Sequence, residues 1–137
     1  MSTYLLEIVT PERLVYTEQV NSISVRGSEG DLGILPGHLP LVTPLKIAPI
    51  RIKIGGQTEV IAVNGGFVEV RKDKVVILAE SAERSEDIDV ERARAARERA
   101  ELRLQSKQEQ IDHHRAEVAL QRALNRLNAT SIRTNKN

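Results

Sequence analysis

The feature that most constrains this chain is an abrupt change of composition near residue 84. All eight glycines lie at or before Gly66, all five prolines at or before Pro49, and every aromatic residue at or before Phe67. From Ser85 onward the chain consists largely of Ala, Arg, Glu, Leu and Gln, which is typical of helices. We therefore expect two architectures in one chain, divided into residues 1–84 and 85–137.

The first part reads as a set of short strands. Runs of Val, Ile and Leu separated by turn residues predict strands at 4–9, 14–18, 20–26, 32–35, 39–46, 50–54, 59–63, 67–71 and 74–79. Because no room remains for crossover helices, we expect antiparallel sheets that close into a sandwich or flattened barrel. Tight hairpins are expected at Gly55-Gly56 and Asn64-Gly65, which supply positive φ at little cost.

The second part predicts two helices with a weak break between them. Acidic residues are expected in the first helical turn, where they complement the helix dipole: Glu86, Asp87, Asp89 and Glu91. Small and apolar residues recur at helical spacing in both halves: Ala93, Ala96, Ala100 and Leu104, then Ala116, Leu120, Ala123, Leu124 and Leu127. The segment 105–110 is polar but holds no strong breaker. The sequence thus leaves open an antiparallel helical hairpin or one helix over 88–128.

Arginines form two rows on these helices. By a rotation of about 100° per residue, one ridge contains Arg115, Arg122, Arg126 and Arg133, and a second row contains Arg92, Arg99 and Arg103. Arginine forks match carboxylates and phosphates, so the ridge predicts an acidic partner surface or a polyphosphate. A simple solvated helix face is the alternative.

Composition excludes several classes of function. A net charge of +1 and 2% aromatic residues argue against a nucleic-acid binder. Cysteine is absent, the adjacent His113 and His114 point about 100° apart, and no phosphate-binding loop or nucleophile motif is present, so we expect no metal site and no enzyme. Without a long apolar run, the chain reads as soluble.

Two segments resemble a known family. The run from Gly27 to Leu41, GSEGDLGILPGHLPL, resembles the signature loop of the epsilon subunit of F-type ATP synthases, and NGGFVEV at 64–70 resembles a second segment of that family. The cysteine-free, aliphatic composition looks most like cyanobacterial or chloroplast members. The resemblance implies an α+β fold, in which an antiparallel β-sandwich of about ten strands precedes a two-helix antiparallel hairpin.

The same resemblance implies a role and partners. Family members are non-catalytic rotor subunits that bind the gamma subunit and the membrane ring of c subunits, while the helical tail moves toward the alpha and beta subunits and inhibits ATP hydrolysis. By position, Glu29 and Asp31 are expected to face the ring and His38 the gamma subunit. Arg115, Arg122, Arg126 and Arg133 would meet an acidic loop of beta. The isolated chain would be a monomer, and the complex would lie at the membrane surface, in a thylakoid for the cyanobacterial or chloroplast type.

Some bacterial members also bind ATP as a regulator through a motif that 88–93, IDVERA, matches. The resemblance then assigns ATP to Glu83, Asp89, Arg92, Arg99, Arg122 and Arg126. An acid followed by arginine is also what helix electrostatics favours. Asp89, Arg92 and the two arginine rows leave a free-standing nucleotide sensor as one alternative to a rotor subunit, and the small-residue seam leaves a self-associating coiled-coil scaffold as another.

Overall fold

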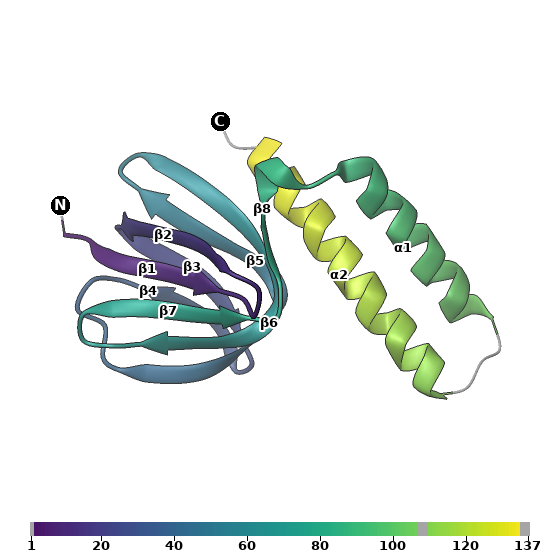
Figure 1. Cartoon of the computed structure of the whole chain (residues 1–137), viewed down its shortest axis with the longest axis horizontal. Helices are drawn as coiled ribbons and strands as arrows, with labels where there is room; N and C mark the ends of the chain where they lie inside the picture. The colour runs from purple at the N-terminus through teal and green to yellow at the C-terminus, as the bar shows by residue number, and fades with distance from the viewer. Residues whose placement is uncertain (1, 107–109, 135–137) are drawn as a thin grey trace.

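The computed structural model describes residues 2–106 and 110–134, apart from the side chains of residues 110, 111, 133 and 134, and shows a β-structure followed by two helices (Figure 1). The strands are β1 (Tyr4–Val9), β2 (Leu14–Val20), β3 (Ser22–Gly27), β4 (Gly30–Ile34), β5 (Leu41–Ile54), β6 (Gln57–Val70), β7 (Lys74–Ala79) and β8 (Ala82–Arg84). A 3-10 turn, η1 (Ser85–Asp87), leads to α1 (Val90–Gln105) and α2 (Gln110–Thr134). The predicted sandwich followed by two helices is confirmed.

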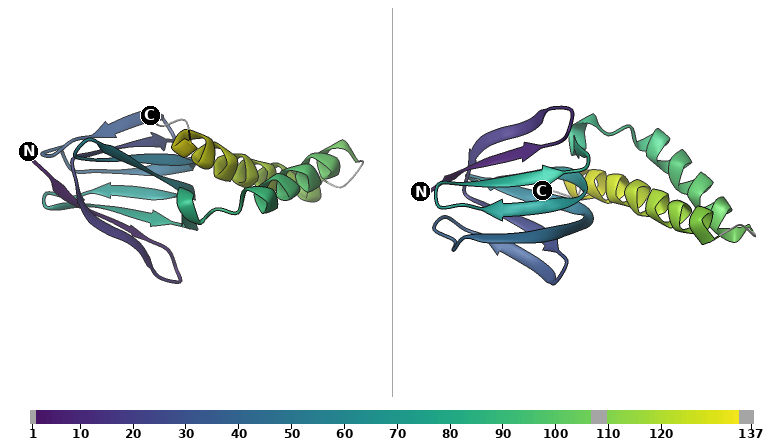
Figure 2. Two further views of the ribbon diagram at one scale, coloured as in Figure 1. Left: turned by 90° about the horizontal axis from the view of Figure 1, so that it is seen from above. Right: turned by 60° about the horizontal axis from the view of Figure 1, so that its bottom comes forward.

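One continuous strand order, β2-β1-β7-β6-β5-β3-β4, curves around an aliphatic core, and β8 pairs with β6 off this path (Figures 1 and 2). The buried core cluster runs from Leu6 to Ala82 and includes no residue of α1 or α2. Strand alternation places one apolar side of each strand inward. The sandwich thus holds its core without help from the helices.

The number of strands is smaller than expected because two predicted pairs are single long strands. Segments 39–46 and 50–54 belong to β5, and segments 59–63 and 67–71 to β6. Pro49 does not end β5, since it pairs with Ala62 of β6 while the ladder to β3 is interrupted at that level. A proline is tolerated where its missing N–H has no strand to reach.

The hairpin expected at Gly55-Gly56 is present, since Ile54 pairs with Gln57 around it. The prediction of a hairpin at Asn64-Gly65 is wrong. Those residues instead form a kink inside β6, where Gly65 and Gly66 have φ of 77° and 128°. Before the kink β6 pairs with β8, and after it with β7, so the kink lets two consecutive strands share one partner.

The expectation of purely antiparallel sheets is also wrong for one pair. β1 and β7 are parallel, from Leu5 beside Lys74 to Val9 beside Leu78. A parallel pair needs a long connection, and here β2 to β6 supply it in place of a crossover helix. The prediction failed because it considered only helical crossovers.

Helix α1 begins later than the acidic cluster suggested. Asp89 is its N-cap and accepts a hydrogen bond from the Arg92 backbone N–H at 3.1 Å, whereas Glu86 and Asp87 lie in η1. α1 ends at Gln105, and the two helices lie antiparallel (Figure 2). Of the two states that the sequence left open, the structure shows the hairpin. No helix in the described ranges is long and apolar enough to span a membrane.

Both tyrosines of the chain give a test of the sandwich at high pH. Tyr4 donates its hydroxyl to the Ile34 carbonyl at 2.7 Å, Tyr16 is buried, and burial raises the pKa of both above the ordinary value of 10.0. In the unfolded chain both hydroxyls have their ordinary pKa and lose their protons at a lower pH than in the folded chain. The contribution of these tyrosines to the free energy of unfolding is therefore intact below pH 10.0 and falls as pH rises above it. Tyrosinate absorbance is expected to appear together with loss of the circular dichroism signal. Ionisation near pH 10.0 with an unchanged fold would contradict this.

Candidate interface between the helical tail and the sandwich

The helical tail contacts the sandwich through α2, while α1 lies on the far side of α2 (Figure 1). Ala129 is fully buried against Val60 and Ala62 of β6 and Ile88 before α1, and Ile132 packs at the margin. This cluster is small beside the sandwich core. α2 contributes Ala129 and the partly buried Ile132 to this cluster, and because burial contributes about 25 cal/mol per Å² of apolar surface, these two side chains hold the tail only weakly.

The two helices meet through alanines. Ala93 and Ala100 are the buried residues of α1, and Ala116 and Ala123 are buried on α2. Such a seam allows close approach of the backbones and removes little apolar surface from water. These four alanines of the predicted stripes are therefore buried in the hairpin, whereas Leu124 of the second stripe is 37% exposed and lines a cavity beside β5.

A buried side-chain amide lies at the centre of the contact between α2 and β6. Asn125 is 2% exposed, and its Nδ2 donates to the Val63 carbonyl at 2.9 Å and to Asn64 Oδ1 at 3.1 Å. Asn64 in turn donates from Nδ2 to Ser81 Oγ at 2.8 Å. The kink of β6 presents Asn64 to α2, so the unusual backbone at 64–66 and the polar contact belong together.

Two ion pairs border this amide. Arg126 Nε lies 2.5 Å from Glu83 Oε1, and Arg122 Nη2 lies 3.8 Å from Glu80 Oε2. Both pairs are partly exposed, so each contributes at most about 1 kcal/mol. Two arginines of the predicted ridge thus face carboxylates of the sandwich, Arg115 is exposed, and the side chain of Arg133 lies outside the described residues.

The residues predicted for ATP lie in different settings. Glu83 and Arg126 pair with each other, Arg122 faces Glu80, Asp89 caps α1, and Arg92 and Arg99 are exposed. Neither of the two cavities described below is lined by any of the six. ATP binding stays a prediction.

The predicted signature-loop residues lie around β3, β4 and the loop that follows. Glu29 is exposed in the β3–β4 turn, and Asp31 of β4 lies 3.2 Å from Arg26 of β3. His38 directly precedes Leu39, which is 79% exposed, and His38 Nδ1 lies 2.7 Å from the Leu39 carbonyl oxygen. No partner chain is present, so their roles toward the ring and gamma stay predictions.

The sequence analysis missed an apolar face on the outside of the sheet. Phe67 of β6 lies beside Leu78 of β7 and beside Pro44 of β5, and Val42 follows on the same side of β5. Phe67, Leu78 and Val42 are 50%, 49% and 63% exposed. The signal was available, because Phe67 alternates with the inward Val68 and Val70 along the strand.

Comparison with known proteins fits this fold over nearly the whole chain. The model described as "ATP synthase, Delta/Epsilon chain, beta-sandwich domain" matches residues 3–85, and "ATP synthase, Delta/Epsilon chain, long alpha-helix domain" matches residues 86–131. A solved structure, "Cryo-EM structure of Euglena gracilis mitochondrial ATP synthase, OSCP/F1/c-ring in rotational state 1", contains a chain with a TM-score of 0.82 and 27% identity; the alignment covers 96% of this chain and 82% of that one.

Curated relatives are more similar in sequence. The ATP synthase epsilon chain of Bacillus mycoides is 51% identical over 133 residues, which is 97% of this chain and 100% of that one. That of Bacillus licheniformis is 58% identical over 127 residues, 93% and 97% of the two chains. These relatives do not support the expected cyanobacterial or chloroplast likeness, nor the thylakoid location drawn from it. The chain therefore belongs to the family of epsilon chains of F-type ATP synthases.

Proposed function

We propose that the sandwich attaches this non-catalytic subunit to the central stalk and that the helical tail inhibits ATP hydrolysis when it leaves the sandwich. The observation that carries the proposal is the contrast between the two contacts. The sandwich has its own aliphatic core, whereas α2 is held by two apolar side chains, one amide and two partly exposed ion pairs. Such a contact can open without unfolding the sandwich.

Attachment through the sandwich is supported by its exposed features. The Euglena structure contains F1 and a c-ring, and we propose that gamma and the membrane ring are the neighbours of this chain. The face of Val42, Phe67 and Leu78 has the apolar, aromatic character of an interface core. Glu29 and Asp31 are proposed to face the ring and His38 the gamma subunit, which would hold the chain at the membrane surface through the complex.

The arginine ridge supports the inhibitory role. In the folded tail Arg122 and Arg126 already face the carboxylates of Glu80 and Glu83. On release, an acidic loop of beta would replace those carboxylates, and Arg115 and Arg133 would join on the same side of α2. The exchange of one carboxylate for another changes the free energy little, so the tail can move in both directions.

A chain ended after Arg84 tests the division of labour. We expect it to keep the circular dichroism of strands, to bind the gamma subunit as the full chain does, and to remove the inhibition of hydrolysis in the assembled complex. A full-length Phe67→Asp variant is the converse test: it is expected to fold and keep its tail but to bind gamma at least about fivefold more weakly, since interface aromatics commonly contribute more than 1 kcal/mol. Unchanged inhibition by the shortened chain, or loss of its binding to gamma while it remains folded, would show the proposal to be wrong.

A further inference from the structure

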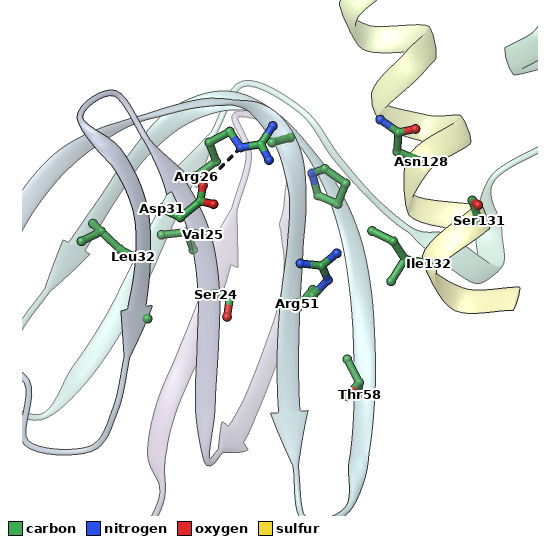
Figure 3. A pocket seen from close by; sticks show the side chains of 13 residues that line it. Ser24, Val25, Arg26, Asp31, Leu32, Arg51, Thr58, Asn128, Ser131 and Ile132 are labelled. Carbon is green, nitrogen blue, oxygen red and sulfur yellow. Dashed lines mark hydrogen bonds and ion pairs between the residues drawn. The ribbon is translucent and has the colours of Figure 1, made fainter. Parts of the chain in front are cut away.

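A groove separates the outer side of β3 to β5 from α2, and it adjoins the contact made by Asn125 but includes none of the residues predicted for ATP. Two cavities of about 850 and about 620 Å³ form it, and they share Arg26, Ala48, Pro49 and Asn128. Figure 3 shows Arg26 and Arg51 on the sheet side and Asn128, Ser131 and Ile132 on the α2 side. Because the two cavities adjoin, the groove is elongated along the helix.

The wall supplied by α2 has the length and chemistry to accompany an extended chain. Residues from Gln121 to Ile132 line it, which at about 1.5 Å per residue is roughly 16 Å of helix, the span of about five extended residues. Three side-chain amides, Gln121, Asn125 and Asn128, occupy this wall. Side-chain amides can both donate to and accept from a peptide backbone.

The side-chain oxygen of one of these amides has no hydrogen-bond donor in the ranges that the structure describes. Asn125 Oδ1 is buried and has no partner among the described residues, although Nδ2 of the same side chain makes two bonds. Buried acceptors are nearly always satisfied, so this unpaired oxygen is an exception, and it belongs to a side chain that lines the smaller cavity.

The groove carries more positive than negative side chains, which indicates the kind of ligand it can bind. Arg26, Lys46 and Arg51 stand on the sheet wall, and Asp31, paired with Arg26, is the one carboxylate among the lining residues. Within the described part of the chain, Lys46 and Arg51 have no ion-pair partner. The lining residues of α2 carry no charge. The surplus of cations favours a segment that carries carboxylates.

We propose that this groove binds an extended acidic peptide segment of a partner protein. The sheet and α2 each form one wall, so the complete groove exists only while the tail is folded onto the sandwich. A bound segment therefore multiplies the ratio of folded to released tail by one plus its concentration divided by its dissociation constant. That consequence rests on the proposed function, whereas the binding itself does not.

The test uses the isolated full chain and an acetylated, amidated hexaglutamate peptide. We expect saturable changes in the backbone amide resonances of Arg26, Arg51, Asn125 and Ser131. Arg51→Gln is expected to weaken binding about fivefold, the loss of one exposed ion pair. Lys53→Gln is the matched control, since Lys53 lies two residues along the same strand and face but does not line the groove. It is expected to bind as the unchanged chain does.

Other probes decide what the groove recognises. Hexaglutamine of the same length is expected to bind more weakly, and inorganic pyrophosphate to displace hexaglutamate poorly, because it reaches only the cations. Equal effects of the two substitutions, changes centred on Arg115 and Arg122, or displacement by pyrophosphate at the peptide's own affinity would each overturn the proposal. None of these measurements depends on the rotor complex, so their failure is separate from a failure of the truncation experiment.

Discussion

Replacement of Asn125 by alanine is expected to release the helical tail from the sandwich without unfolding either part. The substitution removes the donor that bonds the Val63 carbonyl and Asn64 Oδ1, and it leaves both acceptors facing an apolar methyl group. An unsatisfied buried polar group costs about 1–3 kcal/mol, which corresponds to a roughly 5- to 150-fold larger population of released tail.

The measurement is a distance distribution between two spin labels. The chain has no cysteine, so labels on Lys72→Cys in the sandwich and Glu98→Cys on α1, both exposed sites, report only the chosen pair. Asn128→Ala is the matched control, because Asn128 lies one turn further along α2 but is exposed. The control is expected to keep the short distance. If both variants keep it, Asn125 does not hold the tail.

Replacement of Gly66 by alanine is expected to destabilise the sandwich severely. A Cβ at this position would lie 2.0 Å from the Leu78 carbonyl oxygen and 2.9 Å from the Ala79 Cα, and the backbone φ is 128°. The obstacles are backbone atoms of β7, so no side-chain rotation relieves them. Strain and overpacking of this kind each cost about 1–3 kcal/mol, a large part of the 5–15 kcal/mol that stabilises a typical domain.

Urea denaturation provides the comparison. Gly56→Ala is the control, since no atom lies within 4 Å of its Cβ and its φ is outside the left-handed region. We expect the midpoint for Gly66→Ala to fall far below that of Gly56→Ala, or the variant to be unfolded without urea. Equal midpoints would mean that β6 and β7 can separate at the kink at little cost.

Local sequence patterns were enough for most of the strands. Alternation gave β1 and β7 with their observed ends, and Gly55-Gly56 gave the hairpin between β5 and β6. The same reasoning wrongly predicted two strands each for β5 and for β6. Pro49 and Asn64-Gly65 are typical turn residues, and their strand partners cannot be known from the local sequence. The parallel pairing of β1 with β7 was missed because it depends on residues far apart in the chain.

The candidate interface was only half predictable. Helical spacing placed Arg122 and Arg126 on one side of α2, but their carboxylate partners lie more than forty residues earlier. Asn125 gave no signal, since an asparagine in a polar helix normally faces water. Its burial follows from docking against the β6 kink, which is also what stabilises the hairpin over the single long helix.

The parallel pairing of β1 has a consequence for how this subunit is made. β1 lies between β2 and β7. The first strand to leave the ribosome therefore cannot pair on both edges until β7, one of the last strands, has been synthesised. Contacts so distant in sequence form slowly, because the intervening chain must be closed into a loop first. The helices emerge later and meet each other locally. We therefore expect the sandwich to form before the helical tail docks onto it. A nascent chain halted before β7 would leave one edge of β1 unpaired and prone to aggregation.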